Sequence, residues 1–425
     1  MGKPPFALEM KQNSSSERAR ADSIEGVRAQ TRVYLMDLWS FIPYYMARLW
    51  GGLREQGIDV TLGSVRYHLQ RDYFRAVGVS TDRWLLDFGG MIGNPLLRRL
   101  VKSVEYIVNL IVLGLRLFIS RPAILHAEYL PFIDHGFPFE IWFMRYAQRL
   151  GIKVIYTVHN VTYQDTPERN KPVYGRAYRT ADGLICHGEE ARGQVARDFG
   201  ISADKMWVIP HGPLFEEKTH ISQEEARKKL GLPQNEALVL CFGVISEYKG
   251  IPFLLDGWKR LVESGTKGRL LIAGTGDARL LSSIREKVSE YQLQSTVNLW
   301  LEFIPVEQLP FFYQAADILV FPYKAGTTSG ALLTGMNYGK AIVATPLPFF
   351  KEYLEEGCEA LFVEYADVEG LALTLTSLIN APSERERLGR GVAKKSDVFD
   401  SWSSIAHSTV NCYQAIMRGA PPTKR

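Results

Sequence analysis

The chain has 425 residues, of which 46% are hydrophobic and 23% are charged. This composition is typical of a globular protein and excludes global disorder, and the length predicts two or three domains rather than one core. The four cysteines lie far apart without paired spacing, which excludes a disulfide scaffold or a zinc knuckle. Residues 1–10 lack the apolar run of a signal peptide, so we expect a cytoplasmic protein.

The positive charge is concentrated in the first half of the chain. Residues 1–215 contain 27 basic and 21 acidic side chains, whereas residues 216–425 contain 23 and 25. A basic half is typical of proteins that bind an anionic membrane or nucleic acid. No helix-turn-helix, zinc or RNA-recognition pattern accompanies the charge, so the sequence favours the membrane and predicts no nucleic-acid partner.

Strand and helix patterns alternate along most of the chain. Residues 1–30 are polar and rich in serine, and they predict a disordered arm. Residues 31–215 then predict a first Rossmann-like domain, because short apolar runs are separated by helical patterns. The expected strands of this domain are 32–38, 57–62, 123–130, 153–160, 183–188 and 205–212.

A second series of strands and helices follows a connection over residues 213–236. It predicts a second Rossmann-like domain over residues 216–398, with strands expected at 237–244, 269–274, 296–303, 316–323, 340–345 and 360–365. Residues 399–418 predict a last helix that crosses back to the first domain. The fold class expected from the whole pattern is α/β with two doubly wound parallel sheets.

One stretch interrupts the simple alternation. Residues 96–122 are apolar and edged by basic side chains, and their longest charge-free run, residues 106–115, is about half of what a membrane span requires. Three interpretations are open: an amphipathic helix packed on the sheet, a helix lying in a bilayer interface with its basic side chains toward lipid phosphate, or a true span. The basic residues are Arg98, Arg99, Lys102, Arg116 and Arg121.

Two loops of the second domain predict a phosphate site. In residues 321–345 a strand leads through small residues into a helix that begins near Ser329, and free amides at such a start bind phosphate. Gly326 and Gly330 let a ligand approach the backbone, while Thr328 or Ser329 can cap the helix and donate to phosphate oxygens. An ordinary helix cap would give the same pattern.

The second loop is residues 242–250, where Lys249 precedes Gly250 after another strand end. A lysine there places an ammonium group where a diphosphate would lie, although a surface lysine is the alternative. Ligands of open α/β sheets bind at the carboxyl ends of strands, which is where both loops lie. Together they indicate a nucleoside diphosphate.

At this point the sequence resembles the family 4 retaining glycosyltransferases over about residues 31–418. The resemblance rests on FGVISEYKGIPFLL, LLIAGTGD, FYQAADILVFPY, TTSGALLTGMNYGKAIVAT, YTVHN and VIPHGP. It implies the GT-B fold, in which two Rossmann-like domains face each other across an active-site cleft. It also implies a sugar-nucleotide donor in the second domain, an acceptor in the first, no metal, and retention at the anomeric carbon.

The sequence departs from the family pattern around the phosphate loop. Most members have two glutamates eight positions apart, and this chain has Gly326 and Thr334 at those positions. One branch of the family combines YKG, PHGP and a Thr-x-Ser-Gly loop without these glutamates, and this chain resembles that branch. The resemblance therefore assigns donor binding to Lys249 and to a set in the loop and its helix: Gly326, Thr327, Thr328, Ser329, Gly330 and Thr334.

The first domain contributes the candidate catalytic residues. His126 and Glu128 occupy the segment where the family often has a histidine pair, and His159 ends the next strand. A strand-end histidine is commonly structural, but the shared strand-end position favours a catalytic role for His159 and, less strongly, His126. His211 lies in the connection between the domains, where acceptor binding and turn geometry are equally compatible.

These features predict a glycosyltransferase that uses a UDP- or GDP-sugar in polysaccharide or glycolipid biosynthesis. The acceptor is expected to be a saccharide or a lipid-linked sugar, with peripheral contact at the inner face of an anionic membrane. Family members are thought to react by front-side attack, so stabilising the leaving diphosphate is the main task, for which Lys249 and the amides near Ser329 are suited. The alternative is an inactive, glycosyltransferase-like binding subunit of a polysaccharide assembly complex.

Overall fold

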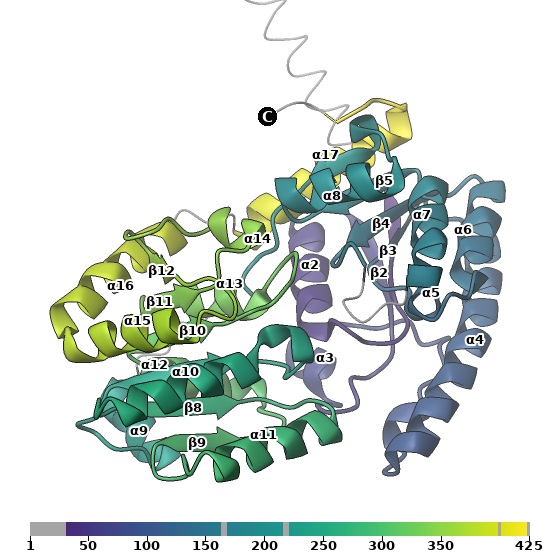
Figure 1. Ribbon diagram of the computed structural model, residues 1–425. Helices are drawn as coiled ribbons and strands as arrows, with labels where there is room; N and C mark the ends of the chain where they lie inside the picture. Colours follow the sequence, from purple (N-terminus) through teal and green to yellow (C-terminus); the bar gives the residue numbers. More distant parts are fainter. Residues whose placement is uncertain (1–30, 163–167, 216–220, 398–400, 423–425) are drawn as a thin grey trace, which may run out of the picture.

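The computed structural model describes residues 31–162, 168–215, 221–397 and 401–422, and the predicted arm of residues 1–30 lies outside them. Two lobes, each built around one parallel sheet, lie side by side (Figure 1). The predicted α/β class with two Rossmann-like domains is therefore confirmed.

The first sheet has six parallel strands, and β1 lies between β2 and β3. Its inner strands β3 and β5 are buried on both faces, which is typical of a parallel sheet covered by helices on either side. In spatial order the strands are β2 (Asp59–Ser64), β1 (Arg32–Asp37), β3 (Ile124–Ala127), β4 (Lys153–Val158), β5 (Gly183–Cys186) and β6 (Met206–Val208).

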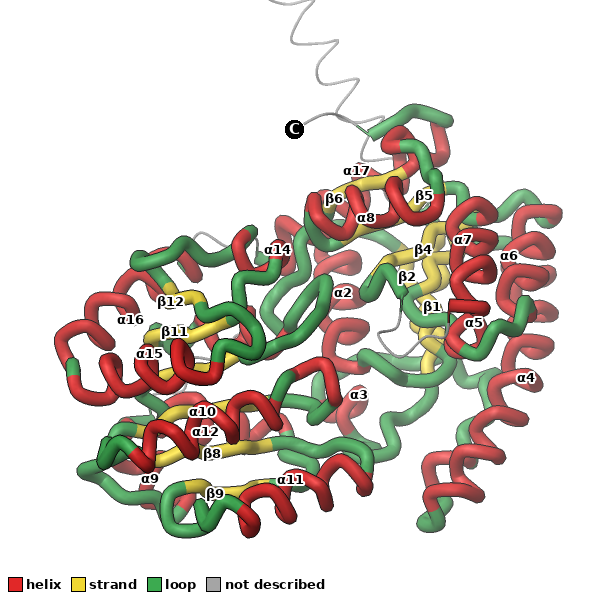
Figure 2. The backbone as a smooth tube through the Cα atoms, in the orientation of Figure 1, coloured by secondary structure: helices red, strands yellow, loops and turns green. Residues whose placement is uncertain are grey.

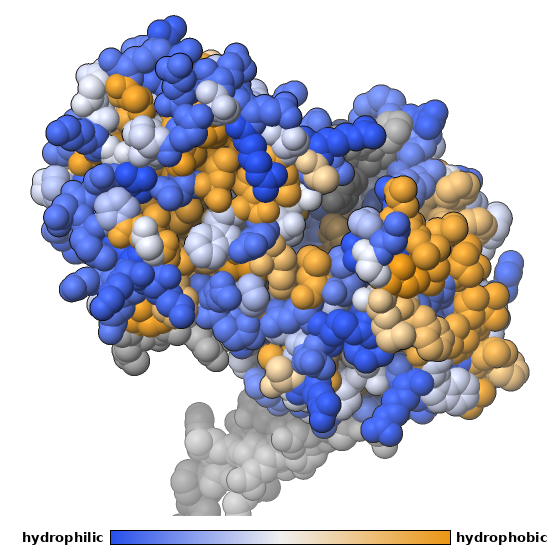
Figure 3. All heavy atoms as spheres, turned by 90° about the horizontal axis from the view of Figure 1, so that it is seen from below, coloured by the Kyte–Doolittle hydropathy of each residue, from blue (hydrophilic) through white to orange (hydrophobic). Residues whose placement is uncertain are grey.

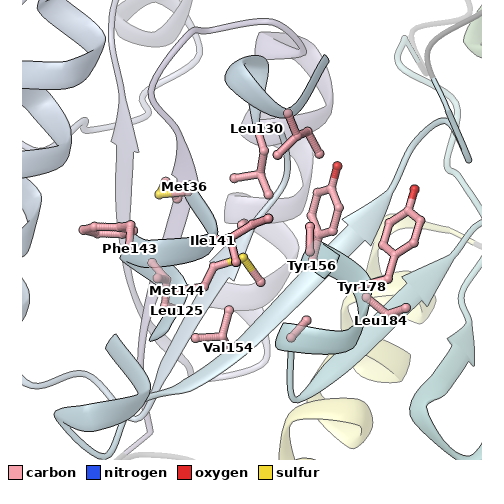
Figure 4. Packing of buried hydrophobic residues seen from close by; sticks show 14 of the residues in the cluster. Met36, Leu125, Leu130, Ile141, Phe143, Met144, Val154, Tyr156, Tyr178 and Leu184 are labelled. Carbon is pink, nitrogen blue, oxygen red and sulfur yellow. The ribbon is translucent and has the colours of Figure 1, made fainter. Parts of the chain in front are cut away.

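Helices cover both faces of this sheet. One hydrophobic cluster joins the sheet to α4, α6 and α7, and Figure 4 shows Met36 and Val154 of the strands packed with Phe143 and Met144 of α6. A second cluster on the opposite face includes α2. The helices are α2 (Pro43–Glu55), α3 (Tyr73–Ala76), α4 (Pro95–Ser120), α5 (Pro131–Asp134), α6 (Phe139–Arg149), α7 (Lys171–Thr180) and α8 (Glu189–Phe199).

The second sheet is also six-stranded and parallel, with the sequence order reversing between β10 and β7. This is the strand order of a Rossmann fold. In space the strands are β12 (Ala360–Phe362), β11 (Ala341–Ala344), β10 (Ile318–Phe321), β7 (Leu238–Phe242), β8 (Arg269–Ala273) and β9 (Val297–Trp300). Its helices are α9 (Gln223–Leu230), α10 (Ile251–Glu263), α11 (Ala278–Glu290), α12 (Leu309–Ala315), α13 (Gly330–Met336), α14 (Pro348–Lys351), α15 (Val368–Asn380) and α16 (Pro382–Ser396).

The last helix, α17 (Trp402–Arg418), packs against the first domain although it follows both sheets in the sequence. Ile405 and Ile416 lie in the same hydrophobic cluster as α2, and the indole N–H of Trp402 donates to the carbonyl of Pro213 over 2.8 Å. In the view of Figure 2 this helix lies at the α8 and β6 end of the first domain, on the face of the sheet opposite to α8. It ties the end of the chain to the first sheet.

Contacts between the domains join loops that follow the carboxyl ends of strands in both sheets. Gln70, after β2, donates to the carboxylate of Glu307 over 3.0 Å. The backbone N–H of Glu190, after β5, donates to Glu352 over 2.7 Å. Because strand ends of parallel sheets are where ligands bind, this junction is the place to look for a site.

Candidate active site

Four histidines and a glutamate gather where four neighbouring strands of the first sheet end. His126 is in β3 and Glu128 follows it, His159 follows β4, His187 follows β5, and His211 comes after β6. Because the strands are parallel and adjacent, their ends bring these side chains together from positions far apart in sequence. The predicted trio of His126, Glu128 and His159 is thus assembled, with His187 added to it.

Hydrogen bonds connect three of these residues into a chain. Nδ1 of His187 lies 3.1 Å from the carbonyl oxygen of Ile209, which can only accept, so Nδ1 carries the proton. Its Nε2 then accepts from Nδ1 of His159, 3.1 Å away. Nε2 of His159 lies 2.8 Å from Oε2 of Glu128, and one shared proton belongs to that pair.

Burial decides where the shared proton resides. The side chain of Glu128 is fully buried, and this raises its pKa to about 7, although the neighbouring His126 and Thr157 oppose the shift. Burial also lowers the pKa of His159 to about 3. The arrangement consistent with both directions is a neutral carboxylic acid that donates to a neutral imidazole. Below about pH 7 this hydrogen-bonded chain of side chains is therefore uncharged, and Glu128 ionises as the pH rises through about 7.

His126 anchors the last helix rather than facing a ligand. Its Nδ1 lies 2.7 Å from the hydroxyl of Tyr413 in α17, and its Nε2 lies 2.7 Å from the hydroxyl of Thr157. Both ring nitrogens are used, and the residue is only 1% exposed. Oε1 of Glu128 is 3.1 Å from the same Nε2 and has no hydrogen-bond partner among the described residues. In this geometry His126 and Glu128 lie behind the site.

His211 differs from the other histidines because one ring nitrogen is free. Nδ1 lies 2.6 Å from the carbonyl oxygen of Gly212, so it carries the proton and Nε2 carries a lone pair. Within the described residues Nε2 has no hydrogen-bond partner. The Cε1 atom bonded to it lies 3.7 Å from the point where a Cβ of Gly330 would stand. His211 therefore brings a hydrogen-bond acceptor to the predicted phosphate loop.

The phosphate loop and the predicted lysine lie together on the second domain. Ser329 caps α13 by accepting from the N–H of Leu332 over 3.2 Å. Nζ of Lys249 is buried over the ring of Tyr323, 5.2 Å from its centroid, and lies 2.8 Å from the Cβ position of Gly243. A Cβ at Gly243 would also contact Ala331 of α13 at 3.5 Å, which places the ammonium beside the start of this helix.

The loop and the helix α13 that follows it carry polar groups without partners. The hydroxyl oxygens of Thr327, Thr328 and Thr334 are buried and form no hydrogen bond with any described residue. Gly326 has a φ of 153°, which glycine adopts readily. Buried polar groups are nearly always paired, so unpaired hydroxyls around a helix that starts beside an ammonium suit an anionic ligand.

Sequence reasoning missed His187 and Tyr45. His187 is the last but one residue of the segment GLICHG, and this is the same strand-end signal that singled out His159. The Tyr45 ring lies between the rings of His159, His187 and His211, with centroid distances of 4.8, 5.6 and 5.0 Å. Nothing in its helical sequence pattern indicated this position. Among the described residues, no group of three His, Cys, Asp or Glu side chains is arranged to hold a metal ion.

The arrangement defines a class of protein: a two-domain GT-B fold with an anion-suited loop on one domain and a histidine cluster on the other. Residues 42–212 match the family model of the glycosyl transferase 4-like domain, and residues 222–395 match that of glycosyl transferases group 1. The chain therefore belongs to the family-4-like glycosyltransferases. The Thr-x-Ser-Gly branch stays a prediction.

Relatives in sequence agree with this family, and solved structures agree with the fold. The chain is 24% identical to D-inositol 3-phosphate glycosyltransferase of Segniliparus rotundus, over 64% of this chain and 63% of that protein. It is 26% identical to alpha-monoglucosyldiacylglycerol synthase of Streptococcus pneumoniae, over 56% of each. The structure of HepE from Anabaena in complex with UDP-glucose superposes with a TM-score of 0.71 at 13% identity, covering 91% of this chain and all of that one. The match thus spans less than two thirds of the first relative's length.

Proposed function

We propose that this protein is a retaining, metal-independent hexosyltransferase that acts in polysaccharide or glycolipid biosynthesis. It transfers a sugar from a UDP- or GDP-sugar to a saccharide or lipid-linked acceptor. One arrangement carries the proposal. Lys249 and the unpaired threonine hydroxyls lie on the second domain, and the free Nε2 of His211 lies on the other side of the domain junction. A nucleotide-sugar donor is also supported by the UDP-glucose complex of the structural neighbour.

The chemistry follows from the charges at this junction. As the bond to the sugar breaks, negative charge grows on the departing diphosphate, and the Lys249 ammonium together with the hydroxyls of Thr327 and Thr328 stabilises it. His211 is neutral, since burial lowers its pKa to about 3, and its Nε2 accepts a hydrogen bond from a sugar hydroxyl. In front-side attack the acceptor's proton passes to a leaving phosphate oxygen, so the reaction needs no basic side chain.

A transfer assay tests this function. The full chain is incubated with UDP-glucose or GDP-mannose, and release of the nucleoside diphosphate is followed with and without saccharide and lipid-linked acceptors. Transfer with retained anomeric configuration, read by proton NMR of the product, is the expected result. Nucleotide binding without either hydrolysis or transfer would instead favour the inactive binding subunit.

We also propose that α4 holds the first domain at the inner face of an anionic membrane. In length and composition α4 could cross a membrane, yet its inner face packs in the domain core through Tyr106, Leu113 and Leu117. Its outer face carries nine exposed apolar side chains, 41% to 81% accessible, and Figure 3 shows the resulting patch. They are Leu96, Leu97, Leu100, Val104, Ile107, Ile111, Leu115, Phe118 and Ile119.

The basic residues of α4 divide between the surface and the interior. Arg99 is exposed, whereas Lys102 is 7% exposed and donates to the carbonyl of Trp39 over 3.1 Å. Arg116 lies 3.4 Å from the carboxylate of Asp82. The prediction that Lys102 faces lipid phosphate is therefore wrong, because the side chain of Lys102 is buried inside the domain.

An apolar stripe with exposed arginine at its first turns fits an interfacial helix on anionic lipid. Vesicle flotation tests it: we expect Ile111→Asp to weaken binding to anionic vesicles, while Leu373→Asp, on an exposed residue of α15 in the other domain, leaves it unchanged. Wild-type protein that stays unbound would contradict the membrane role. A lipid acceptor is compatible with the relative named for a glucosylated diacylglycerol.

A further inference from the structure

A second group of unpaired polar atoms lies on the first-domain side of the junction, near the ends of β1 and β2 and the start of α4. Four buried side-chain atoms there have no hydrogen-bond partner among the described residues: Ser40 Oγ, His68 Nδ1, Arg71 Nη1 and Asp87 Oδ1. Paired polar atoms are the rule in a protein interior. Four unpaired atoms in one place indicate that a polar ligand completes the cluster.

Two glycines bring the basic side chains of this cluster close together. A Cβ at Gly90 would stand 2.8 Å from Nη1 of Arg71 and 3.7 Å from Cβ of His68. A Cβ at Gly89 would stand 2.5 Å from Cγ of Lys102. The absence of side chains at these two positions therefore lets the guanidinium, the imidazole and the lysine stem meet over the backbone of residues 89–90.

Ser40 belongs to the same place. Lys102 donates to the carbonyl of Trp39 over 3.1 Å, and Ser40 is the next residue. Ser40 is 2% exposed and has a φ of 54°, a left-handed conformation that a side chain other than glycine rarely adopts. The turn it forms is held by Asp37, whose carboxylate accepts the N–H groups of Phe41 and Ile42 over 2.8 and 3.1 Å.

Basic side chains slightly outnumber carboxylates around the unpaired atoms: Arg66, Arg71, Arg98 and Lys102 lie near Asp37, Asp87 and Glu105. One oxygen of Asp87 is paired with Arg66, whereas the carboxylates of Asp37 and Glu105 accept backbone N–H groups. Neither Arg71 nor Arg98 has a carboxylate within ion-pair distance among the described residues. Burial, with the charges of Lys102 and Arg98, lowers the pKa of His68 to about 4. The imidazole is therefore neutral at neutral pH.

We propose that Ser40, His68, Arg71 and Lys102 form a subsite for a phosphoryl group of the acceptor. Arginine presents a planar fork of N–H donors that matches phosphate oxygens, and hydroxyl and imidazole N–H groups add single donors. The subsite lies at the junction, since the neighbouring Gln70 contacts Glu307 of the second domain. It rests on the proposed function in one respect, namely that the first domain holds the acceptor.

Isothermal titration of the full chain with inorganic pyrophosphate tests the subsite. We expect two sites on the wild type: Lys249→Ala removes the donor-side site, and Arg71→Gln weakens the other about tenfold. Gly90→Ala is expected to weaken this second site too, because its methyl group would stand where Arg71 now lies. Arg176→Gln, on an exposed arginine of α7, is the matched control and should change neither site.

The outcomes separate this proposal from the donor site. Loss of the second site in Arg71→Gln supports the subsite, whatever Lys249→Ala does. Unchanged binding in Lys249→Ala would count only against the assignment of Lys249 to the donor site. Unchanged pyrophosphate binding in both Arg71→Gln and Gly90→Ala overturns it.

Competition identifies the source of the phosphoryl group. Displacement of pyrophosphate by glucose 6-phosphate supports a soluble phosphorylated acceptor, and displacement by phosphatidylcholine vesicles that contain phosphatidic acid supports a lipid-linked one. If neither displaces it, the site does not receive an acceptor phosphate and the proposal fails.

Discussion

Replacing Glu128 by glutamine tests the hydrogen-bonded chain of Glu128, His159 and His187. In this chain the carboxyl is the proton donor to Nε2 of His159, 2.8 Å away. An amide has nearly the same shape and donates through its NH₂ group, but it cannot ionise. Glu128→Gln is therefore expected to preserve the chain and to remove the cost of ionising a buried carboxyl.

The magnitude follows from the pKa of Glu128, which burial raises from 4.5 to about 7. Between these values the folded protein holds the proton while the unfolded chain releases it. Folding stability contributed by the protonated form is thus present below pH 4.5 and is lost as pH rises to about 7. The loss is about 3 kcal/mol for the whole window.

Thermal unfolding of both proteins at pH 5 and pH 8 measures this loss. We expect similar midpoints at pH 5 and a midpoint higher by roughly 5–10 °C for Glu128→Gln at pH 8. Other buried carboxyls with raised pKa values, Asp37 at about 6 and Glu140 at about 8, titrate equally in both proteins and cancel. Glu290→Gln, on an exposed residue of α11, is the control. A midpoint difference that is independent of pH would refute the assignment of the proton to Glu128.

Three further predictions concern the junction. Lys249→Ala should weaken binding of the nucleoside diphosphate at least tenfold, about 1.4 kcal/mol, because a charge-assisted contact is lost. Calorimetric titration measures this affinity, and an unchanged value would place Lys249 outside the site. Activity should survive EDTA, and an absolute need for magnesium or manganese in a steady-state assay would contradict the metal-independent reaction. His211→Phe keeps a ring beside Tyr45 but removes Nε2, so kcat/KM for transfer should fall about tenfold while nucleoside diphosphate affinity is kept. Equal losses in both quantities would indicate a structural role for His211.

The sequence by itself determined the architecture of the two domains. Alternating apolar runs and helical patterns predicted both parallel sheets, because strand burial on two faces and helix amphipathicity are properties of local sequence. The same reasoning predicted that the loops at Lys249 and Ser329 meet, since both follow strand ends of one sheet. It also placed His126, Glu128 and His159 together.

The tertiary structure decided how those side chains are used. Hydrogen-bond partners depend on residues distant in sequence: Tyr413 of the last helix fixes His126, and the carbonyl of Ile209 sets the proton position of His187. The same holds for Lys102, which a helical pattern places on a basic edge but which the loop at Trp39 draws into the interior. Burial and proton positions arise only when separate segments pack, so no spacing along the chain could assign them.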